Sequence, residues 1–241
     1  MKRSPGTNGI GTLQERSLHA ALKAWYAQPG DAFEQKVGSY VIDLVREPLL
    51  IEFQTRGFSA LRTKLGRLLE QYTVRLVYPI AVEKWIVRTA KNRKKILDRR
   101  RSPKRGAVTD LFKELVYIAE LAMHPSFSLE LVMIREEEIR HDDGKGSWRR
   151  KGVSIGDRRL VEVVGQQLLC GPAAYAMFLP VELPEPFTSR DWSQAHGTPL
   201  WLGQKATYCL RKMGVVAEAG KRGNARLYVR NNRFPCNEKP R

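Results

Sequence analysis

Two acidic side chains, Asp43 and Glu52, stand inside short apolar runs of residues 37–54, where a buried core would take Val or Ile. Each run is typical of a buried strand, and the connection at residues 46–48 is typical of a hairpin. An uncompensated carboxylate in such a strand costs several kcal/mol. A divalent metal ion held between the two strand ends would supply the compensation, so the pattern predicts a metal site.

Two other interpretations of these carboxylates remain open. The strands could lie at a sheet edge with solvated acids, or the acids could pair with Arg46, Arg56 or Lys36. In either arrangement Asp43 and Glu52 would have no metal-binding or catalytic role.

The overall charge of the chain is strongly positive. Its 241 residues include 42 Lys and Arg against 25 Asp and Glu, which is a formal net charge of +17 at pH 7. A field of this strength favours polyanionic partners. We therefore expect nucleic acid first and an anionic membrane surface second.

Targeting and cysteine patterns indicate an intracellular protein. The sequence contains no run of about twenty apolar residues that would span a bilayer. Its N-terminus also lacks the apolar segment of a signal peptide. Cys170, Cys209 and Cys236 form no Cys-x-x-Cys pair and no even set, which argues against a structural zinc or a disulfide framework. We expect a cytoplasmic protein without membrane contact.

Helical patterns flank the two strands that carry the acids. Residues 13–27 have helical apolar spacing with Glu15 in the first turn, and residues 59–72 have it again. Further strands are expected at 74–80 and 85–87. The order of helix, strand, strand, helix and strand implies an α/β fold in which helices flank a mixed sheet.

A basic segment and an acidic triplet follow. Residues 88–105 hold ten Lys and Arg with one acid, and they are either a solvated face or a phosphate-contacting arm. Strands at 128–140 and 146–155 are expected to form a hairpin. Its three consecutive glutamates, 136–138, are expected to be solvated or to pair with the basic residues 149–151, with a second metal site as the alternative.

The C-terminal part of the chain is expected to form a second domain. Pro180, Pro184 and Pro186 mark a linker, because closely spaced prolines interrupt both helix and central strand. We therefore place domains at residues 1–180 and 187–241. The second contains a short helix, a turn, a helix at 200–213 and two strands around a basic turn.

The first domain resembles a known nuclease superfamily. Asp43, an interval of eight residues and Glu52-Phe53-Gln54 are similar to the D-x(n)-(D/E)-x-K core of the PD-(D/E)XK, or restriction-endonuclease-like, superfamily. The resemblance covers residues 11–88 and extends by continuity to about residue 165. It implies an Mg²⁺ or Mn²⁺ site in which Asp43 bridges the metal, Glu52 and the Phe53 carbonyl complete the site, and Glu15 holds a second ion or its water.

The third position of the motif departs from the superfamily pattern. A lysine normally orients the attacking water there, whereas this chain has Gln54, whose amide can orient water but supplies no charge. Lys64 on the following helix is the candidate to replace it, and Arg56 is a poorer one. Ile42 stands where the superfamily often has proline. The four histidines, at positions 19, 124, 141 and 196, show no metal-ligand spacing, and no chemistry is assigned to them.

The second domain resembles a winged helix-turn-helix. In that family the second helix enters the major groove and the hairpin touches the DNA backbone or minor groove. The resemblance implies DNA contacts from the helix and from the wing: Gln204, Lys205, Tyr208, Arg211 and Lys212, then Lys221, Arg222, Asn224 and Arg226. A winged helix used for protein contact is the alternative.

Together these patterns favour a metal-dependent DNA endonuclease that hydrolyses phosphodiester bonds in a single step, acting on duplex or branched DNA. A homodimer or a larger nucleoprotein complex is plausible, because cutting both strands needs two sites. The alternative is a catalytically inactive nuclease-fold protein that binds DNA as a regulator or targeting subunit. An RNA-directed protein is less favoured, since a winged helix suits duplex DNA.

Overall fold

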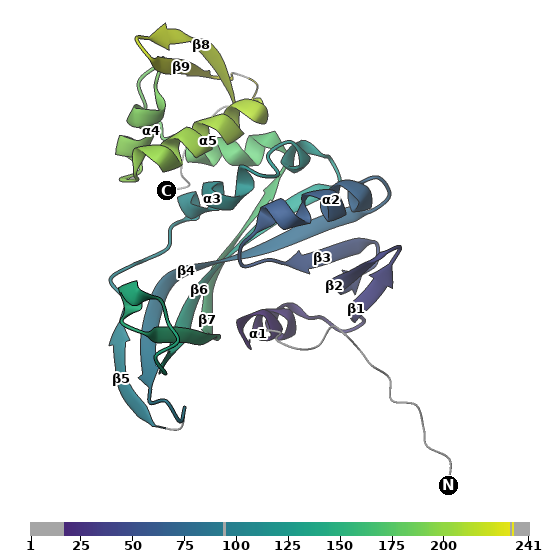
Figure 1. The fold of residues 1–241 in the computed structure, drawn as a ribbon. Helices are drawn as coiled ribbons and strands as arrows, with labels where there is room; N and C mark the ends of the chain where they lie inside the picture. The colour runs from purple at the N-terminus through teal and green to yellow at the C-terminus, as the bar shows by residue number, and fades with distance from the viewer. Residues whose placement is uncertain (1–16, 94, 232, 234–241) are drawn as a thin grey trace.

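A seven-stranded sheet forms the centre of the protein, in a computed structural model that describes residues 17–93, 95–231 and 233 (Figure 1). The strand order is β1-β2-β3-β4-β6-β7, and β5 pairs with β4. The strands are β1 (Ala32–Val37), β2 (Tyr40–Arg46), β3 (Leu49–Phe53), β4 (Thr73–Thr89), β5 (Ile96–Arg101), β6 (Phe127–Asp142) and β7 (Val153–Cys170).

The sheet is mixed, as the sequence predicted. Strands β1, β2 and β3 form an antiparallel meander, and β3 then pairs in parallel with β4 after a crossover through α2 (Phe58–Leu69). Strands β4 and β6 are parallel, and β7 returns antiparallel to β6. The fold is therefore α/β, with helices flanking a mixed sheet.

Helices cover both faces of the sheet. The buried residues Leu18 and Leu22 of α1 (Ser17–Tyr26) pack with Phe53 and Val77, whereas Leu65 of α2 packs in a separate cluster with residues such as Leu76. Val77 and Leu76 are neighbours on β4, and successive strand residues face opposite sides of a sheet. The two helices consequently cover opposite faces, as Figure 1 shows.

Strands β4, β6 and β7 are longer than the sequence patterns predicted. The expected strands at 74–80 and 85–87 are one strand, β4, because its pairing with β6 runs from Val74 opposite Phe127 to Thr89 opposite His141. The expected strand at 146–155 is displaced to β7, which continues to Cys170. We call residues 83–101 and 135–160 the arm, since they project from the body of the sheet (Figure 1).

The basic segment at 88–105 forms an edge of this arm. Strand β5 pairs antiparallel with the far half of β4. Arg88 pairs with Asp142 at 2.7 Å and Arg99 with Glu137 at 2.9 Å, so acids of β6 neutralise part of the segment. Within this segment, residues 96–101 therefore form a strand, and part of the positive charge is compensated.

The C-terminal unit is built from α4 (Ser189–Ala195), α5 (Leu200–Lys212), β8 (Val216–Arg222) and β9 (Ala225–Arg230). Thr188 caps α4, because its side chain accepts a hydrogen bond from the Asp191 backbone amide while the Asp191 carboxylate accepts one from the Thr188 amide. The predicted helix, turn, helix and hairpin are confirmed as secondary structure.

One apolar core joins this unit to the sheet. Phe112 contacts both Phe178 and Trp192 edge-on, with ring centroids 4.9 and 5.7 Å apart, and all three rings are buried. The proline-marked connection also packs against the body, since Leu183 is buried and Phe187 bridges to Tyr228. None of the helices in the described residues is long and apolar enough to cross a membrane.

Candidate active site and nucleic-acid interface

The β2–β3 hairpin brings Asp43 and Glu52 together. Leu44 opposite Ile51 is the last pair of the ladder, so Asp43 and Glu52 are the next residues of the two strands at its open end, and the Asp43 charge is near enough to act on Glu52. The Phe53 backbone amide donates a hydrogen bond to Oδ2 of Asp43 at 2.9 Å. The two acids that the sequence singled out are therefore neighbours at the end of the hairpin.

Asp43 is held as a carboxylate by its hydrogen-bond donors. Burial by itself raises the pKa of Asp43, but hydrogen bonds from His19 and from the Phe53 amide outweigh it and hold the pKa below its usual value. Nε2 of His19 lies 3.3 Å from Asp43 Oδ2 and 3.1 Å from the Phe53 carbonyl oxygen. Because both oxygens are acceptors, Nε2 must carry a proton in this arrangement.

The pKa of Glu52 is shifted in the opposite direction from that of Asp43. Its side chain is 7% exposed, and Lys64 Nζ lies 2.6 Å from its Oε1. Burial raises the pKa of Glu52; the Lys64 hydrogen bond lowers it, the nearby Asp43 charge raises it again, and the net direction is upward. The hairpin thus places an acidic carboxyl beside one that keeps its proton more tightly.

Lys64 reaches the site from α2, as the sequence analysis suggested for a relocated lysine. Its ammonium donates to Glu52 and also to the Val41 carbonyl oxygen at 2.6 Å. The side-chain amide of Gln54 instead donates to the carbonyl oxygen of Arg56. Lys64 therefore places a positive charge beside Glu52, while the Gln54 side chain is bonded within its own loop.

The alternative ion-pair assignments of the two acids are not found. Arg46 pairs with Asp31 at 2.7 Å. Among the described residues, neither Arg56 nor Lys36 makes an ion pair with Asp43 or Glu52. Neither acid is fully solvated, since Glu52 is buried and the Asp43 side chain is 21% exposed.

Two of the oxygens that a metal ion would use meet at His19. Asp43 Oδ2 and the Phe53 carbonyl oxygen both contact its Nε2, and Glu52 is near enough for the Asp43 charge to act on it. Hard oxygen donors suit Mg²⁺ and Mn²⁺, so these residues fit such an ion. In the described part of the chain no three His, Cys, Asp or Glu side chains are already grouped as ligands. Glu15, the expected fourth acid, lies outside the described residues.

His19 is the site residue that sequence reasoning missed. Isolated histidines carry no spacing signal, and no chemistry was assigned to this one. One signal was available, because His19 follows Glu15 by four residues and i,i+4 positions share a helix face. The helix that was expected to contribute Glu15 therefore also had to present His19 to the hairpin.

The acidic triplet on β6 pairs with other partners than predicted. Glu136 and Glu138 are buried, and Lys84 Nζ lies 2.8 and 3.2 Å from their carboxylates. Glu138 also pairs with Arg140 at 2.7 Å. The basic residues 149–151 do not take part, because the displaced β7 sets Glu138 opposite Arg158. The triplet is an internal ion-pair network of the arm.

A groove in the C-terminal unit gathers five of the nine residues predicted to contact DNA. It has a volume of about 610 Å³ and runs between α4, α5 and the β8–β9 hairpin. Its lining includes Gln204, Tyr208, Arg211, Asn224 and Arg226. Lys221 and Arg222 lie at the exposed end of β8. Charged and amide side chains on a helix and a hairpin thus face one open concavity.

Lys205 and Lys212 face the first domain rather than this groove, which corrects their predicted position. Lys205 Nζ donates to the Lys113 carbonyl oxygen at 3.2 Å and lies 5.5 Å from the Tyr117 ring centroid. Lys212 pairs with Glu120 at 2.8 Å. The reason is that α5 packs against residues 112–120, so the side of the helix that carries Lys205 and Lys212 contacts this segment.

Comparisons with known proteins place this chain in a family without assigning a reaction. Residues 16–170 match the model of a family described as Domain of unknown function (DUF8091), a match that spans α1 to β7. A protein of Treponema pallidum (strain Nichols) named "Uncharacterized protein" is 32% identical over 231 residues, covering 94% of this chain and 91% of its own. No solved structure matches the chain. The chain belongs to the DUF8091 family.

Proposed function

We propose that the protein is a divalent-metal-dependent DNA endonuclease with a restriction-endonuclease-like core and a C-terminal winged helix. The observation that carries the proposal is the contact of Lys64 Nζ with Glu52 Oε1 at 2.6 Å, on a hairpin that also holds Asp43. Two neighbouring carboxylates and one ammonium are groups that can hold a divalent ion and stabilise negative charge during phosphodiester hydrolysis.

Asp43, Glu52 and the Phe53 carbonyl would hold Mg²⁺ or Mn²⁺. A bound ion would lower the pKa of a water molecule and offset charge on the phosphoryl oxygens. Because its pKa is lowered, Asp43 is ionised at neutral pH, and its second oxygen, Oδ1, could bind the ion directly. His19 Nε2 donates to Asp43 Oδ2 and to the Phe53 carbonyl oxygen, so it would orient both groups for an ion that uses the remaining Asp43 oxygen.

Lys64 takes the role that the motif lysine has in the resembling superfamily. Its ammonium orients an attacking water by hydrogen bonding and stabilises negative charge that develops on the phosphate. The helix α2 holds this ammonium close to the hairpin, because Leu65 and Leu68 anchor the same helix turn in the core. Gln54, bonded to the Arg56 carbonyl, has no part in the reaction.

The charge distribution supports DNA as the substrate. The net charge of +17 favours a polyanion. The groove of the C-terminal unit presents Arg211 for phosphates and Gln204 and Asn224 for base edges, while its second arginine, Arg226, pairs with Glu218 at 2.8 Å. Residues of both α5 and the β8–β9 hairpin line this groove, and a winged helix contacts DNA through the same two kinds of element.

The decisive test is cleavage of labelled duplex, single-stranded, flapped and four-way-junction DNA with Mg²⁺, Mn²⁺ or EDTA. We expect metal-dependent cutting by the wild type and loss of cutting in Asp43→Asn. Glu182→Gln, which changes an exposed carboxylate in the connection to the C-terminal unit, is the matched control. Cutting that persists in Asp43→Asn, or that ignores EDTA, contradicts the proposal.

A second candidate is a DNA-binding protein that retains the nuclease-like core without cleaving. The observation that favours it is the engagement of both acids by donors, Glu52 by Lys64 and Asp43 by His19, with Gln54 in the motif position. This reading predicts salt-sensitive DNA binding that is the same with and without divalent metal. Absence of cleavage under every metal, with intact DNA binding, would establish it for the isolated chain.

A further inference from the structure

The far end of the arm carries an exposed indole. Trp148 is 83% exposed, the largest exposure among the large apolar side chains of the described residues. It opens a short 3-10 turn, η3 (Trp148–Arg150), in the loop between β6 and β7. We call residues 143–152 the tip. Exposing an indole forfeits a large hydrophobic gain, so its position calls for a partner.

The tip is a closed, ordered loop. The Gly146 amide donates to the Gly152 carbonyl at 2.7 Å, and the Lys151 amide donates to the Trp148 carbonyl at 2.9 Å. Gly146 passes so close to Val153 that a side chain there would collide with the Val153 backbone. Lys151 adopts a left-handed conformation with φ 51°. The loop therefore holds Trp148 outward on a fixed support.

Four cationic residues lie within three positions of Trp148 in the sequence. Lys145, Arg149, Arg150 and Lys151 lie within seven residues, and among the described residues none of them pairs with a carboxylate. Asp142 pairs with Arg88, and Asp143 accepts hydrogen bonds from the Lys145 backbone amide and the Ser154 hydroxyl, so Asp143 offsets part of the charge of Lys145 alone. The Arg149 guanidinium lies 5.6 Å from the Trp148 ring centroid. The tip is thus an aromatic side chain in a positive field.

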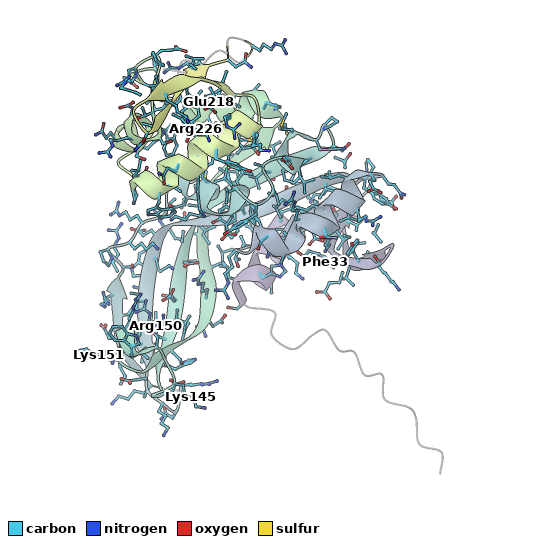
Figure 2. All side chains as sticks on the ribbon, turned by 45° about the horizontal axis from the view of Figure 1, so that its top comes forward. Phe33, Lys145, Arg150, Lys151, Glu218 and Arg226 are labelled. Carbon is cyan, nitrogen blue, oxygen red and sulfur yellow. The ribbon has the colours of Figure 1, made fainter. Side chains whose placement is uncertain are left out.

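Further positive charge lies beside the tip. Thr89 pairs with both Ile96 and His141, and Asp142 pairs with Val153, so the 90–95 turn and the tip share one end of the arm. That turn carries Lys91, Arg93 and Lys95. Figure 2 shows Lys145, Arg150 and Lys151 at this end and Glu218 and Arg226 at the opposite end of the molecule.

We propose that the tip is a second DNA contact that recognises unpaired nucleotides, with Trp148 stacked on an exposed base and the surrounding Lys and Arg on the flanking phosphates. This inference rests on the proposed DNA-directed function and specifies its substrate as branched or frayed DNA. Base faces are accessible to an indole only where a strand is unpaired, because duplex stacking covers them. Basic side chains around the ring supply the phosphate contacts that such sites use.

The charge pattern argues for nucleic acid over a lipid surface. A membrane-bound loop needs several apolar side chains that enter the bilayer interface. The residues next to Trp148 are Ser147 and Arg149, and the rest of the tip is glycine or charged. One indole within a cluster of cations fits a stacked base and its phosphates.

The test measures DNA binding in EDTA, where cleavage plays no part, using a flapped DNA and a blunt duplex of equal length. Trp148→Ala should lower affinity for the flapped DNA by about 5- to 150-fold, the range of a lost base stack. Its affinity for the duplex should change by less than about twofold, since the groove of the C-terminal unit is intact. Trp148→Phe should restore most of the difference, and Trp25→Ala, which removes another exposed indole, should have no effect.

A second readout follows the stacked base directly. The fluorescence of 2-aminopurine at the first unpaired position should fall on binding of the wild type and not on binding of Trp148→Ala. Equal losses of flap and duplex affinity, or unchanged quenching in the variant, overturn the inference while leaving DNA binding itself in place. A blue shift of Trp148 emission with phosphatidylserine vesicles but not with DNA overturns it in favour of a lipid surface. Failure of the wild type to bind any DNA refutes the proposed function as well.

Discussion

The Nζ atom of Lys64 lies 2.6 Å from Oε1 of Glu52, although the two residues are twelve positions apart and belong to a helix and a strand. This contact gives the hairpin a positive group without a lysine on β3. It also leaves the ammonium only partly desolvated, since the Lys64 side chain is 17% exposed. The position is open enough for a substrate phosphate or water to approach the same group.

Removing the Lys64 ammonium is expected to abolish most cleavage. Lys64→Met keeps the aliphatic stem but deletes the donor, and loss of one preorganised donor to a developing charge lowers kcat by about 10²- to 10³-fold. Single-turnover cleavage of the preferred DNA with Mg²⁺ measures this effect.

Arg67→Met is the control, because it removes a cation from an exposed position of the same helix. The proposed role of Lys64 is contradicted by equal rates in wild type and Lys64→Met. Thermal unfolding of both variants reports whether the helix remains folded.

The free energy of unfolding should respond to pH through Glu52. Its folded-state pKa is raised above 4.5 by burial and by the Asp43 charge, so the native state binds this proton more tightly than the unfolded chain does. The stability that it contributes is present below pH 4.5 and is lost as pH rises through the folded pKa. Glu52→Gln has no carboxyl to ionise and does not lose this stability. The free energy of unfolding of Glu52→Gln, relative to that of the wild type, should therefore rise between pH 4 and pH 7.

Urea unfolding at the two pH values measures this difference, with Glu182→Gln as the exposed control. Asp43 acts with the opposite sign: its lowered pKa contributes stability above pH 3.8 that is lost as pH falls further. A relative stability of Glu52→Gln that falls with rising pH would show that Lys64 dominates over burial.

His19→Ala should weaken metal binding by about 10- to 100-fold, the usual effect of removing a group that orients a ligating carboxylate. His19 contacts both Asp43 and the Phe53 carbonyl, and without it the pKa of Asp43 rises toward its ordinary value. Titration of Mn²⁺ by calorimetry measures the affinity.

His124→Ala controls for loss of an imidazole, because the His124 ring accepts a hydrogen bond from the Ser126 amide and no hydrogen bond or ion pair among the described residues joins it to Asp43, Glu52 or Phe53. Unchanged Mn²⁺ affinity in His19→Ala would mean that the metal does not use Asp43 and Phe53 together.

Arg211 and Lys212 are adjacent on α5 but should differ in their effect on DNA binding. Arg211 lines the groove of the C-terminal unit, whereas Lys212 pairs with Glu120 at the interface. Arg211→Gln should reduce the slope of log affinity against log salt by about 1, which corresponds to one lost phosphate contact. Lys212→Gln should leave the slope unchanged.

Fluorescence anisotropy of a labelled duplex at several salt concentrations gives both slopes. The assignment of the groove as the DNA-facing side of α5 is overturned if Lys212→Gln has the larger effect.

Phe112→Ala should destabilise the whole chain by about 3–5 kcal/mol, because it empties a buried position between Phe178 and Trp192. Since this ring joins the C-terminal unit to the sheet, we expect a single unfolding transition for both parts. Met123→Ala, at a 42% exposed position, should change stability by less than about 1 kcal/mol.

Circular dichroism and Trp fluorescence followed during urea unfolding make the comparison. Two separate transitions in the wild type would mean that the shared aromatic core does not couple the C-terminal unit to the sheet.

Local patterns in the sequence were sufficient for part of the order of elements, whereas β1 and β5 were not predicted as strands. The hairpin carrying Asp43 and Glu52, the helix at α2 and the helix, turn, helix and hairpin of the C-terminal unit were all predicted and are confirmed as secondary structure. Apolar residues recur every 2 positions in a strand and every 3.6 positions in a helix when one face of the element is buried. This spacing can be read within the element itself. The length of β4 and the position of β7 were missed, because strand extent depends on pairing with a partner.

The sequence by itself determined which groups are available: two acids in buried strands, a strong positive charge and a basic helix-hairpin unit. Only the tertiary structure decided which of them meet. Helix packing places Lys64 and His19 beside the hairpin. It also places Lys205 and Lys212 against residues 113–120. Strand pairing places Trp148 at the end of the arm. These contacts join residues that are distant in sequence, so they depend on register and packing, which local spacing does not encode.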